Sequence, residues 1–168
     1  MKKIKLTQNQ YTLVDDEDYN KLNQWKWCAL YQPSVDDFYA VRHSPLKNGK
    51  RITIYMHRLI SNAPRDKQVD HISHATLDNR KQNLRICTQA QNQHNTKLRK
   101  NTSSKYKGVS WCKINKKWLT QIRINTRGVY LGSFKSEIQA ARAYDRKARE
   151  LFGEFALLNF KEPIKIVV

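Results

Sequence analysis

One segment, Gln68 to Asn95, has side chains that suit cleavage of a phosphodiester bond: QVDHISHATLDNRKQNLRICTQAQNQHN. Such hydrolysis needs a base that takes a proton from water, and it needs stabilisation of the charge on the phosphorane and on the leaving oxygen. A neutral histidine can take the proton near pH 7, and one hard divalent ion can stabilise both charges. Because Mg²⁺ prefers oxygen ligands and keeps several waters, one carboxylate and one amide oxygen suffice from the protein.

Four residues of the segment have these side chains. Asp70 supplies a carboxylate, His71 is a candidate base, and Asn92 offers an amide oxygen. Asn83 opens an apolar run, where it is placed to tie the loop or to orient His71. Side chains alternate along a strand, so Asp70 and His71 serve one site only if the strand ends or is distorted there.

The elements around these residues follow in a simple order. KQVDHI is expected to form a short strand, SHATLDNRKQ a polar loop and NLRIC a second strand. A helix is expected to begin in TQAQNQHNTKL, where Thr88 and Gln91 have the spacing of a capping box. Residues 67–97 are therefore predicted to run strand, loop, strand, helix.

The pattern V-D-H-I … L-D-N-R-x-x-N-L-R … T-x-x-x-N resembles the HNH homing endonucleases of phage and intron origin, whose fold is the ββα-metal motif, or His-Me finger. The resemblance implies that His71 is the general base and that Asp70 and Asn92 hold one Mg²⁺ or Mn²⁺ ion. It implies that Asn83 is the central Asn, hydrogen-bonded across the loop to hold His71. Three further matching positions, expected to hold the loop or to contact DNA phosphate, are Asn79, Arg80 and Arg85.

Two other histidines were weighed against this site. His74 stands three residues after His71, but no fourth zinc ligand has a natural spacing, and Cys87 sits in an apolar strand. Loop polarity is the favoured interpretation of His74. His57 precedes an apolar pair in a short helix, and a structural role is favoured over a phosphate contact.

Charge and composition point to a polyanionic partner. The chain has 168 residues and a net charge of +18, and residues 1–41 contribute none of the positive excess. No apolar run approaches the roughly 18 residues of a membrane helix, and MKKIKLTQNQ lacks the apolar core of a signal peptide. Three distant cysteines indicate reduced thiols. The expected partner is double-stranded DNA, in the cytoplasm of a bacterial host, with no membrane, no evident protein partner and a monomeric chain.

The second half of the sequence has a different pattern. Residues 96–105 form a polar, basic connector without periodicity, and its candidate DNA contacts are Lys97, Arg99 and Lys100. Three strand-like runs follow: YKGVSWCK, KWLTQIRI and VYLGSF. A helix is then expected from a capping box at Ser136 to a stop at Gly153. Its predicted apolar face comprises Ile138, Ala141, Tyr144, Ala148, Leu151 and Phe152.

Residues from about 104 to 160 resemble the plant APETALA-two/ethylene-response-factor DNA-binding domain, through Y-K-G-V, Y-L-G-S-F, A-A-R-A-Y-D and L-N-F. The resemblance implies a three-stranded sheet in the major groove, braced by the helix. The candidate DNA contacts are Lys107, Ser110, Lys113, Gln121, Arg123, Arg127 and Tyr130. Ser110 and Cys112 stand where the plant family tends to place Arg, so the plant target sequence is not transferred.

The whole chain is predicted to be an α+β protein. An N-terminal mixed region with the nuclease motif spans 1–95, the linker 96–105, a three-stranded antiparallel sheet on one helix 106–160, and a tail 161–168. The predicted function is a metal-dependent, sequence-recognising DNA endonuclease of phage or mobile-element type, which nicks one strand as a monomer. Two alternatives stay open: a non-catalytic DNA-binding regulator that keeps the scaffold, and an RNA-binding protein, which is disfavoured because A-form RNA hides its major groove.

Overall fold

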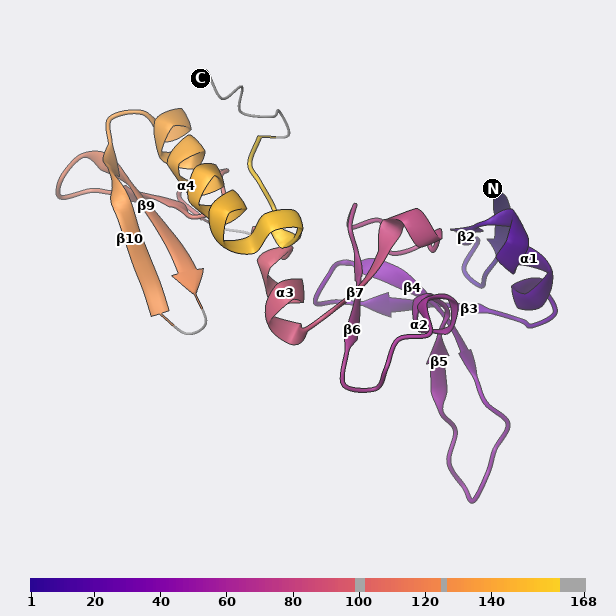
Figure 1. The fold of residues 1–168 in the computed structure, drawn as a ribbon. Coiled ribbons are helices and arrows are strands. Elements are labelled where there is room, and N and C mark those ends of the chain that lie inside the picture. Colours follow the sequence, from indigo (N-terminus) through magenta and orange to yellow (C-terminus); the bar gives the residue numbers. More distant parts are fainter. Residues whose placement is uncertain (99–101, 125–126, 161–168) are drawn as a thin grey trace. The chain divides into compact units, whose positions relative to one another are not determined.

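A computed structural model describes residues 1–98, 102–124 and 127–160, and the chain divides into two compact units, Met1–Gln89 and the part from Ala90 onward (Figure 1). Mixed helices and antiparallel sheets confirm the α+β class. Arg99 and Lys100, which were predicted to contact DNA, and the tail 161–168 lie outside the described residues. The predicted boundaries at 95 and 105 stay predictions.

The N-terminal region of the first unit contains two antiparallel sheets. The first pairs β1 (Lys2–Lys5) with β2 (Tyr11–Val14). The second has the order β3-β4-β5, with β3 at Cys28–Gln32, β4 at Asp37–His43 and β5 at Thr53–Tyr55. YTLV and DFYAVRH are rich in aromatic and β-branched residues, which predicts the strands found as β2 and β4, whereas the sequence of β1, mostly lysine, does not predict a strand.

Two short helices complete this region. α1 (Asp16–Asn23) has three acidic residues in its first turn, where they suit the helix dipole. α2 (Met56–Ser61) ends at Asn62, which adopts a left-handed conformation with φ 48°. A core of buried apolar side chains joins these elements: Ile4, Leu6, Val14, Leu22, Trp27, Ala29, Ala40 and Met56. Within the described part of the chain, no helix is long and apolar enough to cross a membrane.

The segment with the candidate catalytic residues has the predicted order of elements. β6 (Gln68–His71) pairs antiparallel with β7 (Leu84–Cys87), the short 3-10 helix η1 (Lys81–Asn83) precedes β7, and α3 (Gln89–His94) follows it. His71 is the last residue of β6. The strand therefore ends where the alternation argument required it to end.

The N-terminal region holds the long loop between β6 and β7. The Leu13 N–H donates to the Leu77 carbonyl at 2.9 Å, and the Asn79 N–H donates to the Leu13 carbonyl at 2.9 Å. The loop thus runs along β2 like a short additional strand. The Thr76 hydroxyl also donates to the Phe38 carbonyl at 2.6 Å. Residues 1–60, to which the sequence assigned no role, form the frame of this loop.

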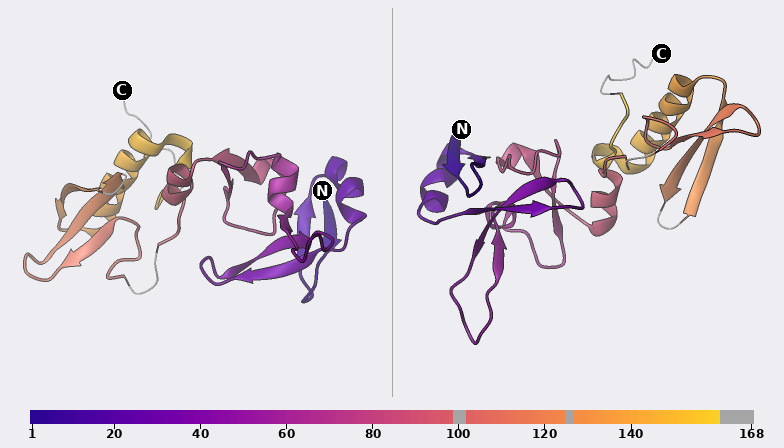
Figure 2. Two further views of the ribbon diagram at one scale, coloured as in Figure 1. Left: turned by 90° about the horizontal axis from the view of Figure 1, so that it is seen from below. Right: turned by 180° about the vertical axis from the view of Figure 1, so that it is seen from behind.

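The second unit contains the predicted three-stranded sheet with one helix on it (Figure 2). Its strands are β8 (Val109–Cys112), β9 (Lys117–Ile124) and β10 (Arg127–Phe134), in the order β10-β9-β8. The helix α4 (Glu137–Phe152) follows and passes into the 3-10 turn η2, Gly153–Phe155.

The helix α4 begins after Ser136 and ends at Gly153 as predicted, but its capping and its apolar face differ from the prediction. Ser136 is the N-cap residue but makes no side-chain cap hydrogen bond, so the predicted capping box is wrong. The predicted apolar face is also partly wrong, because Ile138 and Leu151 are 49% and 38% exposed. The residues that α4 buries are Ala140, Ala141, Tyr144, Asp145 and Ala148.

A glycine and a tyrosine meet closely behind the sheet. Gly108 has φ +78°, and a Cβ there would lie 2.0 Å from the Tyr144 ring and 2.8 Å from the Gln121 carbonyl oxygen. No other residue fits so close an approach in this conformation. The glycine of Y-K-G-V and the tyrosine of A-Y-D therefore belong to one contact.

Asp145 organises the end of the described chain. This buried carboxylate accepts hydrogen bonds from the backbone N–H groups of Asn159, at 2.8 Å, and Phe160, at 2.9 Å. The Asn159 amide oxygen in turn accepts from the Lys107 N–H at 2.7 Å, and its amide nitrogen donates to the Lys107 carbonyl at 3.1 Å. The L-N-F sequence thus fixes the backbone of the residue that precedes Gly108.

Replacing Gly108 by alanine is expected to destabilise the second unit by about 3 kcal/mol or more, since the new methyl group meets both a ring and a backbone oxygen in a strained conformation. Urea denaturation measures the change. Gly128→Ala is the matched control, because its added Cβ lies no closer than 3.6 Å to the Gln121 side chain. Equal stability of the two variants would contradict the prediction.

Candidate functional site

Asp70 forms a buried ion pair across the β6–β7 pair. Its strand partner is Arg85, whose Nε and Nη2 donate to Asp70 Oδ2 at 2.9 Å and 2.6 Å. The two side chains are only 7% and 10% exposed. Arg85 was predicted to contact DNA, but its guanidinium here compensates the charge of the candidate metal ligand.

His71 is buried and is oriented by a hydrogen bond to Asn79. The ring Nε2 lies 3.1 Å from Asn79 Oδ1, and the side chains are 5% and 1% exposed. The Asn79 amide nitrogen donates to the Thr12 hydroxyl at 2.8 Å, and that hydroxyl donates to the Leu77 carbonyl at 2.8 Å. We call this set, His71–Asn79–Thr12–Leu77, the buried relay.

The polarity of the buried relay determines which ring nitrogen of His71 carries the proton. The Leu77 carbonyl can only accept, so the Thr12 hydroxyl must donate to it and accept from Asn79. The Asn79 amide nitrogen therefore points to Thr12, and its oxygen points to the ring. Nε2 must carry hydrogen to make that bond, which leaves the lone pair of the neutral ring on Nδ1.

Burial also favours the neutral form of His71. Desolvation lowers the pKa of the ring below its ordinary value, and it outweighs the hydrogen bond to Asn79 and the negative charges of Asp70 and Asp78, which raise the pKa. A histidine that is neutral at pH 7 and has one defined lone pair has the properties of a general base.

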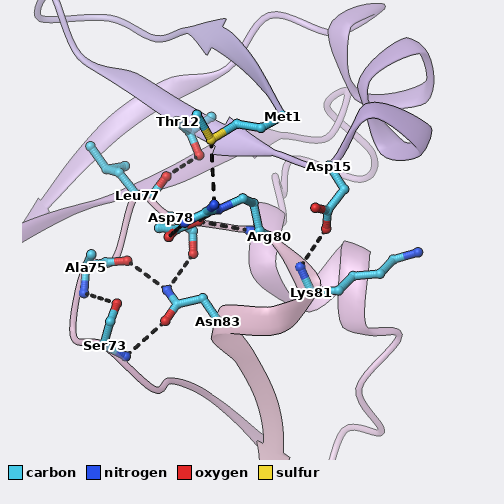
Figure 3. Close-up of polar contacts among 10 residues, drawn as sticks. All are labelled: Met1, Thr12, Asp15, Ser73, Ala75, Leu77, Asp78, Arg80, Lys81 and Asn83. Carbon is cyan, nitrogen blue, oxygen red and sulfur yellow. Dashed lines mark hydrogen bonds and ion pairs between the residues drawn. The ribbon is translucent and has the colours of Figure 1, made fainter.

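Asn83 ties the loop between β6 and β7 (Figure 3). Its amide oxygen accepts from the Ser73 N–H at 2.9 Å, and its amide nitrogen donates to the carbonyls of Asp78, at 2.8 Å, and Ala75, at 3.4 Å. Asn83 thus acts on the loop backbone, while Asn79 makes the hydrogen bond to the His71 ring. Two asparagines therefore act where the resemblance implied one: Asn79 orients the His71 ring, and Asn83 holds the loop.

Arg80 holds the same loop rather than standing exposed toward phosphate. Its Nε and Nη2 donate to the two oxygens of Asp78 at 2.7 Å and 2.6 Å, and these bonds hold the pKa of the Asp78 carboxyl below its usual value. The Lys81 N–H next to it donates to the Asp15 carboxylate at 2.7 Å, which attaches η1 to the N-terminal region (Figure 3).

Two aromatic rings contact His71 and a third packs against them, and the sequence did not single these residues out as part of the site. The His57 ring lies edge-on to the His71 ring, with centroids 5.2 Å apart. Tyr39 contacts both rings at 5.9 Å and 5.4 Å, and Tyr55 lies 5.4 Å from His57. Burial lowers the pKa of His57 to about 3, so its ring is neutral. His57 was expected to be structural, and its neutral ring packs against the ring of the candidate base.

The remaining nuclease residues are distributed as follows. Asn92 lies on α3 within the second unit, so its place at the Asp70–His71 pair stays a prediction. Lys97 is exposed. No three His, Cys, Asp or Glu side chains gather to hold a metal ion within residues 1–98, 102–124 and 127–160. A zinc site at His74 would need such a group, whereas a magnesium site with one carboxylate and one amide would not.

The β8–β10 sheet presents a polar face on the side away from α4. Gln121 pairs with Tyr130 and Arg123 with Gly128, and residues paired across antiparallel strands share a face. Gln121, Arg123 and Tyr130 are exposed, as is Lys113 beyond β8, while Ser110 is half-buried.

Two predicted DNA contacts are placed differently from this polar face. Arg127 pairs with Ile124, so by alternation it belongs to the opposite face from Arg123. The Lys107 ammonium donates to the carbonyls of His94, at 2.6 Å, and Thr96, at 2.8 Å. The charged end of Lys107 therefore contacts carbonyl oxygens of its own unit.

The model of the AP2 domain family matches this unit over residues 104–154. Residues 104–154 are an AP2 domain. Among plant relatives, the AP2/ERF and B3 domain-containing transcription repressor TEM1 of Arabidopsis thaliana is 38% identical over 47% of this chain and 22% of its own. Dehydration-responsive element-binding protein 2D of the same plant is 41% identical over 39% of this chain and 32% of its own. The AP2 domain indicates DNA binding.

A viral relative is named as a nuclease. An uncharacterized HNH endonuclease of Acanthamoeba polyphaga mimivirus is 41% identical over 96 residues, which are 57% of this chain and 49% of the relative. That stretch is longer than the AP2 match, so part of it lies outside residues 104–154. The chain spans about half the length of this relative. Together the two findings confirm the resemblance to HNH endonucleases with an AP2-type DNA-binding domain.

Replacing Thr12 by the isosteric valine is expected to lower the free energy of unfolding by about 1 to 3 kcal/mol, because the Leu77 carbonyl and the Asn79 amide both lose a buried partner. Urea denaturation provides the measurement. Thr53→Val is the control, since the Thr53 hydroxyl makes only an exposed contact of 3.4 Å to His43. Two equally stable variants would show that the buried relay does not support the fold.

His57 is expected to make the protein acid-sensitive. Its pKa is about 3 in the folded chain and near 6.5 in the unfolded chain, so unfolding takes up a proton at mildly acidic pH. The stability contribution is complete above about pH 6.5 and is lost as the pH falls toward 3, by up to about 1.4 kcal/mol per pH unit.

Denaturation curves between pH 7 and pH 5 test this linkage. The fall in stability should be shallower in His57→Gln, which carries no titratable ring, than in the unsubstituted protein. Parallel pH profiles would mean that His57 is not buried as a neutral ring.

Proposed function

We propose that this protein is a divalent-metal-dependent DNA endonuclease of the HNH type, with His71 as its general base. The observation that supports this most strongly is the buried relay, which leaves a neutral His71 with its lone pair on Nδ1 beside Asp70. The AP2 domain and the relative named as an HNH endonuclease supply the DNA context.

His71 takes a proton from the attacking water at Nδ1. Its Nε2–H bond to Asn79 persists in the imidazolium, so the ring does not need to turn during the step. The charges of Asp70 and Asp78 favour the protonated ring and so lower the cost of proton transfer in a buried place. The Tyr39 and His57 rings exclude competing water from the other side.

The ion, Mg²⁺ or Mn²⁺, would be held by Asp70 and Asn92, and when bound it stabilises the charge on the phosphorane and on the leaving oxygen. The donor chemistry fits, because a carboxylate and an amide oxygen are hard ligands and leave room for water and phosphate. Arg85 already donates to the Asp70 carboxylate. An ion there would therefore share that carboxylate with the guanidinium, which compensates the charge of Asp70 and favours a loosely held ion.

The AP2 domain would supply affinity and register on double-stranded DNA. Arg123 and Gln121 suit the edges of guanine and adenine in the major groove, and Tyr130 shares their face. Because the chain has one nuclease motif, we propose that a monomer nicks one strand. The viral relative is consistent with a phage or mobile-element setting, and the host cytoplasm is the proposed site of action.

A second candidate is a non-catalytic DNA-binding regulator. The name of one plant relative, a transcription repressor, favours it. The four buried polar side chains Asp70, His71, Asn79 and Asn83 speak against it, since polar groups in the interior cost stability that a pure binding protein need not lose.

A supercoiled-plasmid assay in Mg²⁺, on a library of phage DNA fragments, tests the nuclease. The unsubstituted protein should produce open circles, and His71→Ala should lower the rate by about 10² to 10⁴. His43→Ala is the matched control, because His43 is exposed at the end of β4. Chelation by EDTA should abolish nicking. A His71→Ala protein that cuts as fast as the His43 control would overturn the assignment.

A further inference from the structure

The short helix α3 is built into the unit of the AP2 domain. The His94 ring at its end stacks on the Phe152 ring of α4, with centroids 3.6 Å apart and planes 9° from parallel. The His94 carbonyl accepts from the Leu157 N–H at 3.4 Å. The division of the chain into units also falls at the start of this helix, after Gln89.

Lys107 completes this attachment. Its Nζ donates to the carbonyls of His94, at 2.6 Å, and Thr96, at 2.8 Å. The last carbonyls of a helix lack partners within the helix and carry its negative end, so an ammonium there is favourable. Asn159 fixes the Lys107 backbone from both its N–H and its carbonyl. The lysine is thus held firmly, and it can hold α3 in turn.

The alternative role of Lys107 is the phosphate contact that its sequence position suggests. A phosphate-binding lysine is normally exposed and strongly hydrated. Lys107 is half-buried, and burial lowers its pKa to about 8. Such a place is costly for an ammonium unless carbonyl oxygens surround it, as His94 and Thr96 do here.

We propose that Lys107, with the His94–Phe152 stack, is a positioning device that fixes α3, and with it Asn92, to the unit that binds DNA. The inference rests on the proposed function, in which Asn92 is a metal ligand. Asp70 and His71 belong to the first unit and Asn92 to the second.

The test uses the full chain with Lys107→Met, which keeps an apolar stem and removes the charge, and Lys135→Met as the control, because Lys135 is exposed and has no proposed role in DNA binding. Hydrogen–deuterium exchange of residues 89–95 should become faster only in Lys107→Met. Affinity for DNA, and its dependence on salt, should match the control. The Mg²⁺ concentration for half-maximal nicking should rise by between about 10-fold and 100-fold, as for the loss of groups that orient metal ligands.

Two outcomes would overturn the proposal. Unchanged exchange in residues 89–95 would show that Lys107 does not hold α3. Weaker DNA binding with a salt slope reduced by about one would show that Lys107 contacts a phosphate. His94→Leu serves as a second variant should Lys107→Met not fold, since it removes the ring stack alone. If no protein nicks DNA, the proposed function fails, while exchange and DNA binding still decide the attachment of α3.

Discussion

A buried histidine can act as a base only if its surroundings keep it neutral and point one lone pair at the reaction. Burial keeps His71 neutral. The hydrogen bonds from the Leu77 carbonyl through Thr12 and Asn79 fix which ring nitrogen carries the proton, because each donor and acceptor has only one possible direction. Other parts of the first unit hold the buried relay in place. β2 carries Thr12 and borders the loop through Leu13, and Asn83 closes the loop from within.

The same constraint explains where the charges of the loop are placed. Asp70 and Asp78 both lie close enough to affect the ring, and each has its own arginine. Without Arg85 and Arg80 these carboxylates would raise the pKa of the ring further and place uncompensated charge in a largely buried loop. Arg85 and Arg80 thus stabilise the loop through their ion pairs with Asp70 and Asp78.

The sequence predicted the local elements well, and it predicted poorly what depends on distant contacts. Alternation and aromatic content located β2 and β4, and the spacing of Asp70, His71 and Asn83 indicated one polar site. Nothing in YTLV shows that Thr12 would bond to Asn79, because that contact depends on the fold of both regions. The predicted apolar face of α4 was wrong at Ile138 and Leu151, which are exposed. Packing against a twisted sheet, rather than hydropathy alone, determines which residues of the helix are buried. Lys107 looked like a phosphate ligand because sequence shows charge but not burial.

The pairing of Thr12 with Asn79 spans 67 positions of the chain. Contacts of such long range form late in folding, after local hairpins and helices, since a large loop must first close. A ribosome must therefore synthesise both N-terminal hairpins and the whole β6–β7 segment before the candidate base acquires its orientation. In a nascent or truncated chain that contains Asp70 and His71 but lacks the Thr12–Asn79 pairing, the His71 ring would not be oriented. The orientation of His71 in the candidate site is in this way delayed until the first unit has been completed.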